Sequence, residues 1–98
     1  MLWSWRIWLK VITLLKNQFE RSATGIGANI REANYAQSKA DFLSKLQIAL
    51  KECNESEYWL WLLYETNSLT EAEFQNFYGK CVELRRMLVS SVTTLKCK

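Results

Sequence analysis

The side chains that could carry chemistry in this sequence are cysteines, carboxylates and cations, because none of the 98 residues is a histidine. Without histidine, the sequence excludes Ser-His-Asp and Cys-His catalysis, histidine zinc sites and a histidine general base. The three cysteines, Cys53, Cys81 and Cys97, have no CxxC spacing and form neither a zinc quartet nor a secreted disulfide framework. We therefore interpret them as reduced thiols and expect a cytoplasmic protein.

The carboxylates do not form a catalytic or metal-binding group either. Glu52, Glu55 and Glu57 are close in sequence, but helical spacing spreads them around the axis, which is typical of a solvated acidic face. A di-iron bundle needs Glu-x-x-His pairs, and none occurs. The segment GIGANI lacks the third glycine and the preceding strand of a dinucleotide motif. The sequence therefore predicts no catalytic residue, no metal site and no cofactor, so we expect that the protein is not an enzyme.

The charges are divided along the chain although their sum is only +3. Residues 1–51 carry +5, residues 52–79 carry −6 and residues 80–98 carry +4. Such a division favours head-to-tail contacts or polyanion binding, with an unevenly charged solvated surface as the alternative. Phosphate binding needs lysine and arginine on one exposed surface. The candidate nucleic-acid-binding residues are Arg21, Arg31, Lys39, Lys45, Arg85 and Arg86.

The elements that would position these residues are helices, because proline is absent and glycine occurs only three times. We predict one all-α domain with helices over 2–16, 18–36, 39–66 and 70–95, broken near Asn17, Gln37 and 67–69. Short links would make it an antiparallel up-down-up-down four-helix bundle. Ser38 is the predicted cap of the third helix, and Thr70-x-x-Glu73 is a capping box for the fourth.

Apolar residues at alternating spacings of three and four define the expected core. On the third helix they are Phe42, Leu46, Ala49, Cys53, Ser56, Leu60 and Leu63, and on the fourth Phe74, Phe77, Cys81, Leu84, Leu88, Ser91 and Leu95. The first helix has two such stripes, Trp5-Trp8-Ile12-Leu15 and Trp3-Ile7-Val11-Leu14. Arg6, Lys10 and Lys16 interrupt its apolar run, so we expect neither a signal peptide nor a membrane span.

One bundle core can cover only one of the two stripes on the first helix. The other would leave a large apolar patch that soluble monomers seldom expose, and tryptophan is a frequent interface anchor. We therefore predict a homo-oligomer. Its interface residues would be Trp3, Trp5, Ile7, Trp8 and Val11.

The stretch ERSATGIGANIREANYAQSKADFLSKLQIALKECNESEYWL resembles the small bacterial four-helix-bundle proteins encoded by intervening sequences in 23S rRNA genes. That family includes the accessory variability determinant of diversity-generating retroelements. The resemblance is strongest over residues 20–62 and extends in pattern over 66–95. It implies a four-helix bundle that assembles into a homopentameric ring. In the retroelement branch it also implies a basic nucleic-acid-binding surface and a reverse transcriptase as partner.

These observations lead to two expectations about function. The first is a non-enzymatic, oligomeric accessory protein that binds RNA or DNA through a basic surface without base specificity, with a reverse transcriptase as a possible partner. The alternative is a ring that acts as a protein-binding scaffold and has no nucleic-acid role. A salt-dependent binding assay separates the two, because phosphate contacts weaken steeply with salt.

Overall fold

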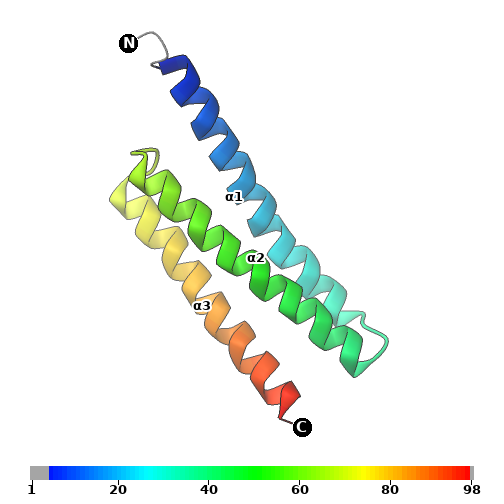
Figure 1. Cartoon of the computed structure of the whole chain (residues 1–98). Helices are drawn as coiled ribbons and strands as arrows, with labels where there is room; N and C mark the ends of the chain where they lie inside the picture. The colour runs from blue at the N-terminus through cyan, green and yellow to red at the C-terminus, as the bar shows by residue number, and fades with distance from the viewer. Residues whose placement is uncertain (1–4, 98) are drawn as a thin grey trace.

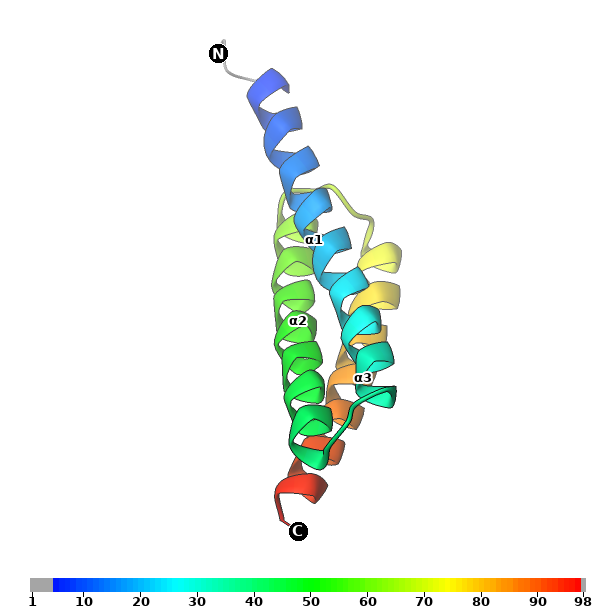
Figure 2. The same ribbon diagram turned by 90° about the vertical axis from the view of Figure 1, so that its right-hand side faces the viewer.

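The computed structural model describes residues 5–97, and every regular element in that range is a helix (Figure 1). The helices are α1 (Trp5–Asn34), α2 (Lys39–Glu65) and α3 (Glu71–Lys96). α2 packs against both α1 and α3, whereas the backbones of α1 and α3 do not approach each other closely. Short turns make each helix antiparallel to the next, so that α1 and α3 run parallel (Figures 1 and 2). The predicted all-α class is confirmed for the described residues.

The predicted break near Asn17 is wrong, because α1 continues through it as one helix of 30 residues. The helices predicted over 2–16 and 18–36 are therefore a single element, and residues 5–97 form three antiparallel helices where four were predicted. A single asparagine costs only about 0.7 kcal/mol relative to alanine in a helix interior, which is too little to end a helix between good helix formers such as Lys16 and Gln18. Gly25 is tolerated within the same helix, and its carbonyl accepts a hydrogen bond of 2.8 Å from the Asn29 side chain.

Local capping explains where α2 and α3 begin. The Ser38 hydroxyl accepts a hydrogen bond from the Asp41 backbone N–H at 3.0 Å. Thr70 and Glu73 form the predicted capping box, with reciprocal hydrogen bonds of 3.1 and 3.0 Å. Between the two helices, Asn67 adopts a left-handed conformation with φ of 59°, which asparagine tolerates better than most residues. The bounds of both helices agree with the predicted 39–66 and 70–95 to within one residue.

The core is built around α2. Six of the seven residues in its predicted stripe are buried, and the seventh, Phe42, packs at the edge of the core. α1 contributes Ile26 and Ala33, and α3 contributes Phe74, Leu88 and Val92. The α3 stripe is only partly covered, because Phe77 remains 38% exposed and Val92 takes the buried place that was predicted for Ser91. The ring of Phe74 stacks on the rings of Tyr64 and Tyr78, and these contacts help to pack α3 against α2 near the turn between them.

The molecule is elongated, with extents of 58 × 23 × 17 Å and a radius of gyration of 16.2 Å. A compact domain of this length would have a radius of gyration of about 13 Å. The accessible surface of 7108 Å² also exceeds the ~5,800 Å² expected for a monomer of this mass. The excess has a visible source, since the N-terminal part of α1 extends past the α2–α3 turn (Figures 1 and 2). Within the described residues, no helix is apolar enough over a sufficient length to cross a membrane.

The α2 core gives a direct test of the packing. Leu60 is completely buried, so Leu60→Ala should lower the free energy of unfolding by about 2–5 kcal/mol through lost burial and a cavity. Ile48→Ala on the same helix is the control, because Ile48 is 39% exposed and lies outside the buried stripe, so the change should cost less than about 1 kcal/mol. Urea denaturation of the two variants measures both values. Equal losses would contradict the burial of the stripe.

Candidate nucleic-acid interface

A row of cations follows the outer face of α1. Lys10, Arg21 and Arg31 are all exposed, and at about 100° per residue their directions around the helix axis span about 80°. The three side chains therefore lie on the same side of the helix, separated by about 16 and 15 Å along its axis. Among the described residues, no carboxylate forms an ion pair with any of the three. Their charges are thus available to a ligand.

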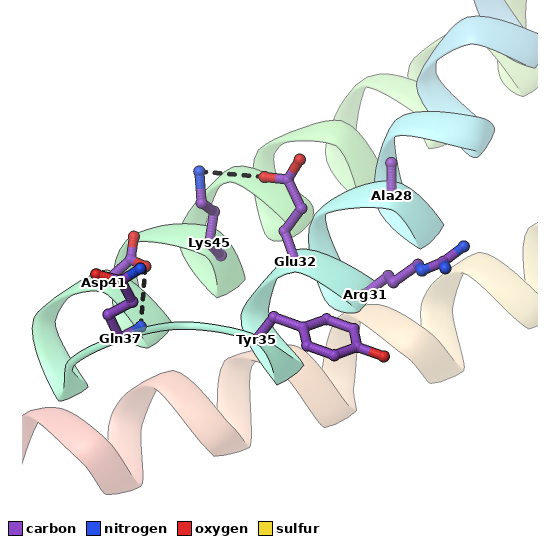
Figure 3. A pocket seen from close by; sticks show the side chains of 7 residues that line it. All are labelled: Ala28, Arg31, Glu32, Tyr35, Gln37, Asp41 and Lys45. Atoms are coloured by element: carbon purple, nitrogen blue, oxygen red, sulfur yellow. Dashed lines mark hydrogen bonds and ion pairs between the residues drawn. The ribbon is translucent and has the colours of Figure 1, made fainter.

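At the α1–α2 turn, Arg31 lies at the rim of a hollow of about 550 Å³ (Figure 3). Inside it, Lys45 Nζ is 3.2 Å from Glu32 Oε2, and the Asp41 carboxylate accepts a hydrogen bond of 3.4 Å from the Gln37 backbone N–H. These contacts leave the hollow itself close to neutral. The Arg31 side chain extends away from the Lys45–Glu32 pair, on the same side as the ring of Tyr35 (Figure 3).

Arg31 and Tyr35 together offer two kinds of contact to a nucleic acid. The guanidinium can bind a phosphate, and the tyrosine ring, which is 77% exposed, can stack on a base. Neither contact distinguishes one base from another. This end of α1 can therefore hold a nucleic-acid chain without reading its sequence.

On α3 the predicted cations are in a different situation. Arg85 Nε donates a hydrogen bond of 2.7 Å to Glu57 Oε2, and the Glu57 side chain is only 15% exposed. The charge of Arg85 is therefore compensated by Glu57 at the contact between α2 and α3. Arg86 beside it is exposed.

The six predicted cations thus divide into three groups. Arg21 and Arg31 share the outer face of α1, and Lys45 lies near Arg31 but pairs with Glu32. Lys39 is exposed at the first turn of α2. Arg85 and Arg86 are on α3, of which only Arg86 lacks an ion pair in the described part of the chain.

Two residues of this surface were missed by the sequence reasoning. Lys10 was assigned to a separate first helix, so its alignment with Arg21 was not apparent. Counting turns through Asn17 without a break would have placed it on the same face. Tyr35 was expected near the end of a helix, and no sequence signal indicated that its ring would be exposed beside Arg31.

The predicted oligomer interface is exposed where the structure describes it. Ile7, Trp8 and Val11 are 44%, 47% and 39% exposed, and Leu9 and Leu14 beside them are more so. Trp3 and the side chain of Trp5 lie outside the described part of the chain. The first turns of α1 therefore present apolar side chains over most of their circumference.

The thiols near Arg85 are shielded rather than activated. Burial raises the pKa of Cys53 to about 11, with further increases from the neighbouring Cys81 and Glu57. Burial also raises the pKa of Cys81. The Cys53 thiol donates a hydrogen bond of 3.2 Å to the Cys81 carbonyl. At neutral pH both groups are therefore protonated and poor nucleophiles.

Comparisons with known proteins place these features in context. The family model described as "23S rRNA-intervening sequence protein" matches residues 10–90. A solved structure from Bacteroides thetaiotaomicron VPI-5482, described as a protein of unknown function from the S23 ribosomal protein family, is 48% identical. That match covers 81% of this chain and 70% of the other, with a TM-score of 0.79. No curated protein matches the chain.

The thiol environments predict a simple reactivity pattern. Cys97 is exposed near the end of α3, whereas Cys53 and Cys81 are protonated and at least partly buried. At pH 8, a chromogenic disulfide reagent should label one thiol per chain rapidly in the native protein and three in denaturant. Replacing Cys97 by serine should abolish the rapid phase. Rapid labelling of a second thiol in the native protein would contradict the shielding of Cys53 and Cys81.

Proposed function

Because the chain belongs to the 23S rRNA-intervening sequence protein family, we propose that it is a non-enzymatic homo-oligomer that binds nucleic acid without base specificity. The observation that carries the proposal is the row of Lys10, Arg21 and Arg31 on the outer face of α1, which is exposed and forms no ion pair with any residue that the structure describes. Each cation of such a row can contact a phosphate of a nucleic-acid backbone, and these contacts need no sequence-specific motif. Tyr35 adds a surface on which any base can stack.

Assembly is part of the proposal, because one copy offers few phosphate contacts. An oligomer repeats the row, so that the second and later contacts form within one complex and the overall affinity rises. The pentameric ring that the resemblance implies would present five such rows. The resemblance to the retroelement branch also supports a reverse transcriptase as the protein partner, acting on the same nucleic acid.

The binding surface can be tested by charge reversal. Arg21→Glu/Arg31→Glu should weaken binding to every RNA and DNA probe, and should reduce the slope of log affinity against log salt concentration by about 2. Fluorescence anisotropy with RNA and DNA of unrelated sequences, at several salt concentrations, measures both quantities. Circular dichroism checks that the helical content is unchanged.

Arg86→Glu/Lys96→Glu on α3 is the matched control. It changes the net charge by the same amount, and each pair removes one cation from the last turn of a helix, so the effects on the helix dipoles are also alike. The control should bind as the wild type does. Loss of binding in the control alone would move the surface to α3. No binding by the wild type at low salt would reject the proposal in favour of the protein-binding scaffold.

A further inference from the structure

Tyr35 holds an uncovered aromatic ring on a fixed backbone just after the end of α1. Its N–H donates a hydrogen bond of 3.1 Å to the Glu32 carbonyl, and the Ala36 N–H donates one of the same length to the carbonyl of the buried Ala33. The ring itself is 77% exposed, and among the described residues no other aromatic ring contacts it. The α1–α2 turn therefore presents a free aromatic face at a defined position.

The hollow of about 550 Å³ beside this ring is suited to an uncharged group (Figure 3). Two cations and two carboxylates line it, namely Arg31, Lys45, Glu32 and Asp41. Lys45 is paired with Glu32, which leaves the Asp41 carboxylate without an ion pair among the described residues. That carboxylate repels a phosphate from the inside of the hollow, and the Arg31 guanidinium attracts one at the rim. A ligand with an uncharged ring and a phosphate would therefore enter ring first.

We propose that the hollow at the α1–α2 turn receives an unpaired base of a single-stranded nucleic acid, with the base stacked on Tyr35 and a phosphate bound by Arg31. The inference rests on the proposed function and names its ligand class more narrowly. Each copy of the oligomer would bind single strands in preference to duplexes, whatever their sequence.

The spacing of the two contacts suits one nucleotide or two neighbours in a strand. Arg31 and Tyr35 are four residues apart, and at helical spacing their Cβ atoms lie about 5–6 Å from each other. Both side chains extend to the same side of the turn (Figure 3). The hollow is also large enough, because its volume lies within the range of ~300–1,000 Å³ that is typical of small-ligand sites.

A duplex cannot use this site in the same way. Its bases are paired and stacked, so one of them would first have to be turned out of the helix at a cost in free energy. A single strand has unpaired bases, and any of them can stack on an aromatic ring because each has a π-face. Phosphates are present in both forms, so Lys10, Arg21 and Arg31 do not distinguish them. The preference for single strands must therefore come from Tyr35 and the hollow.

Fluorescence anisotropy with a short single strand and a blunt duplex of the same sequence and length tests the preference. The wild type should bind the single strand at least about fivefold more tightly, which corresponds to the lower end of the contribution of one stacked base. Tyr35→Ala should lower the affinity for the single strand by a similar factor and leave the affinity for the duplex unchanged. Tyr35→Phe keeps the ring and should bind both probes as the wild type does.

Tyr58→Ala is the matched control. Tyr58 is also an exposed tyrosine, at 56%, but it lies on α2 and does not line the hollow. Its replacement removes the same atoms from the surface and should change the affinity for neither probe. Circular dichroism should show the same helical content in the variants at both tyrosines.

Two further measurements separate the base contact from the phosphate contact. In a single strand with abasic sites the phosphates remain, so the wild type should bind it less tightly than the intact strand, whereas Tyr35→Ala should bind both equally. Arg31→Gln should reduce the slope of log affinity against log salt concentration by about 1 for single strand and duplex alike. Tyr35→Ala should leave that slope unchanged, because it removes no charge.

The outcomes separate this inference from the proposed function on which it rests. Equal affinity of the wild type for single strand and duplex would overturn the inference alone. So would equal behaviour of Tyr35→Ala and Tyr58→Ala, or equal binding of intact and abasic strands by the wild type. Salt-dependent binding would still support the proposed function in each of these cases. No binding of either probe at low salt would overturn both.

Discussion

The burial of one stripe of α2 between its two neighbours holds this molecule together. Ala49, Cys53, Ser56 and Leu60 are completely inaccessible, because α1 covers them from one side and α3 from the other. Three of these four side chains are small, which lets both neighbouring helices approach closely. The Ser56 hydroxyl has no hydrogen-bond partner among the described residues. The close approach at this position is therefore obtained at the expense of a buried polar group, which typically costs about 1–3 kcal/mol.

The same arrangement leaves the side opposite α2 open. Because α1 and α3 both pack on α2 and hardly on each other, each has part of its apolar face uncovered. Phe19 and Phe77 meet edge to face with ring centroids 6.1 Å apart, and beyond this contact an apolar groove between α1 and α3 is open to solvent. The length of α1 adds to the imbalance, since its first turns have no partner helix beside them. The groove between α1 and α3 and the first turns of α1 are both uncovered because residues 5–97 form three helices, of which α1 extends beyond the other two.

Much of the fold could be predicted from the sequence because its signals are local. Leu46 to Leu63 repeat at alternating spacings of three and four, and Thr70 and Glu73 form their capping box within four residues. The break at Asn17 was mispredicted because a helix end requires positive stop signals, and Asn17 has neither a glycine nor a proline beside it. The exposure of Phe77 could not be predicted, since its periodicity is that of a core residue and the missing cover belongs to tertiary structure.

The residues of the candidate site also divide into those that the sequence could place and those that it could not. Arg21 and Arg31 could be assigned to one helix from the sequence alone. The pairing of Arg85 with Glu57 could not, because it joins residues 28 positions apart and depends on the register between α2 and α3.

The spacing of the cations on α1 explains why assembly and binding belong together. Neighbouring charges in the row are about 15 Å apart, which exceeds the Debye length of about 8 Å at physiological ionic strength. Each cation therefore acts almost independently, and no single copy builds up a strong local potential. Affinity must come from the number of contacts that one complex can make at once. The two faces of α1 serve these two needs, because its apolar side can join copies while its polar side carries the cations.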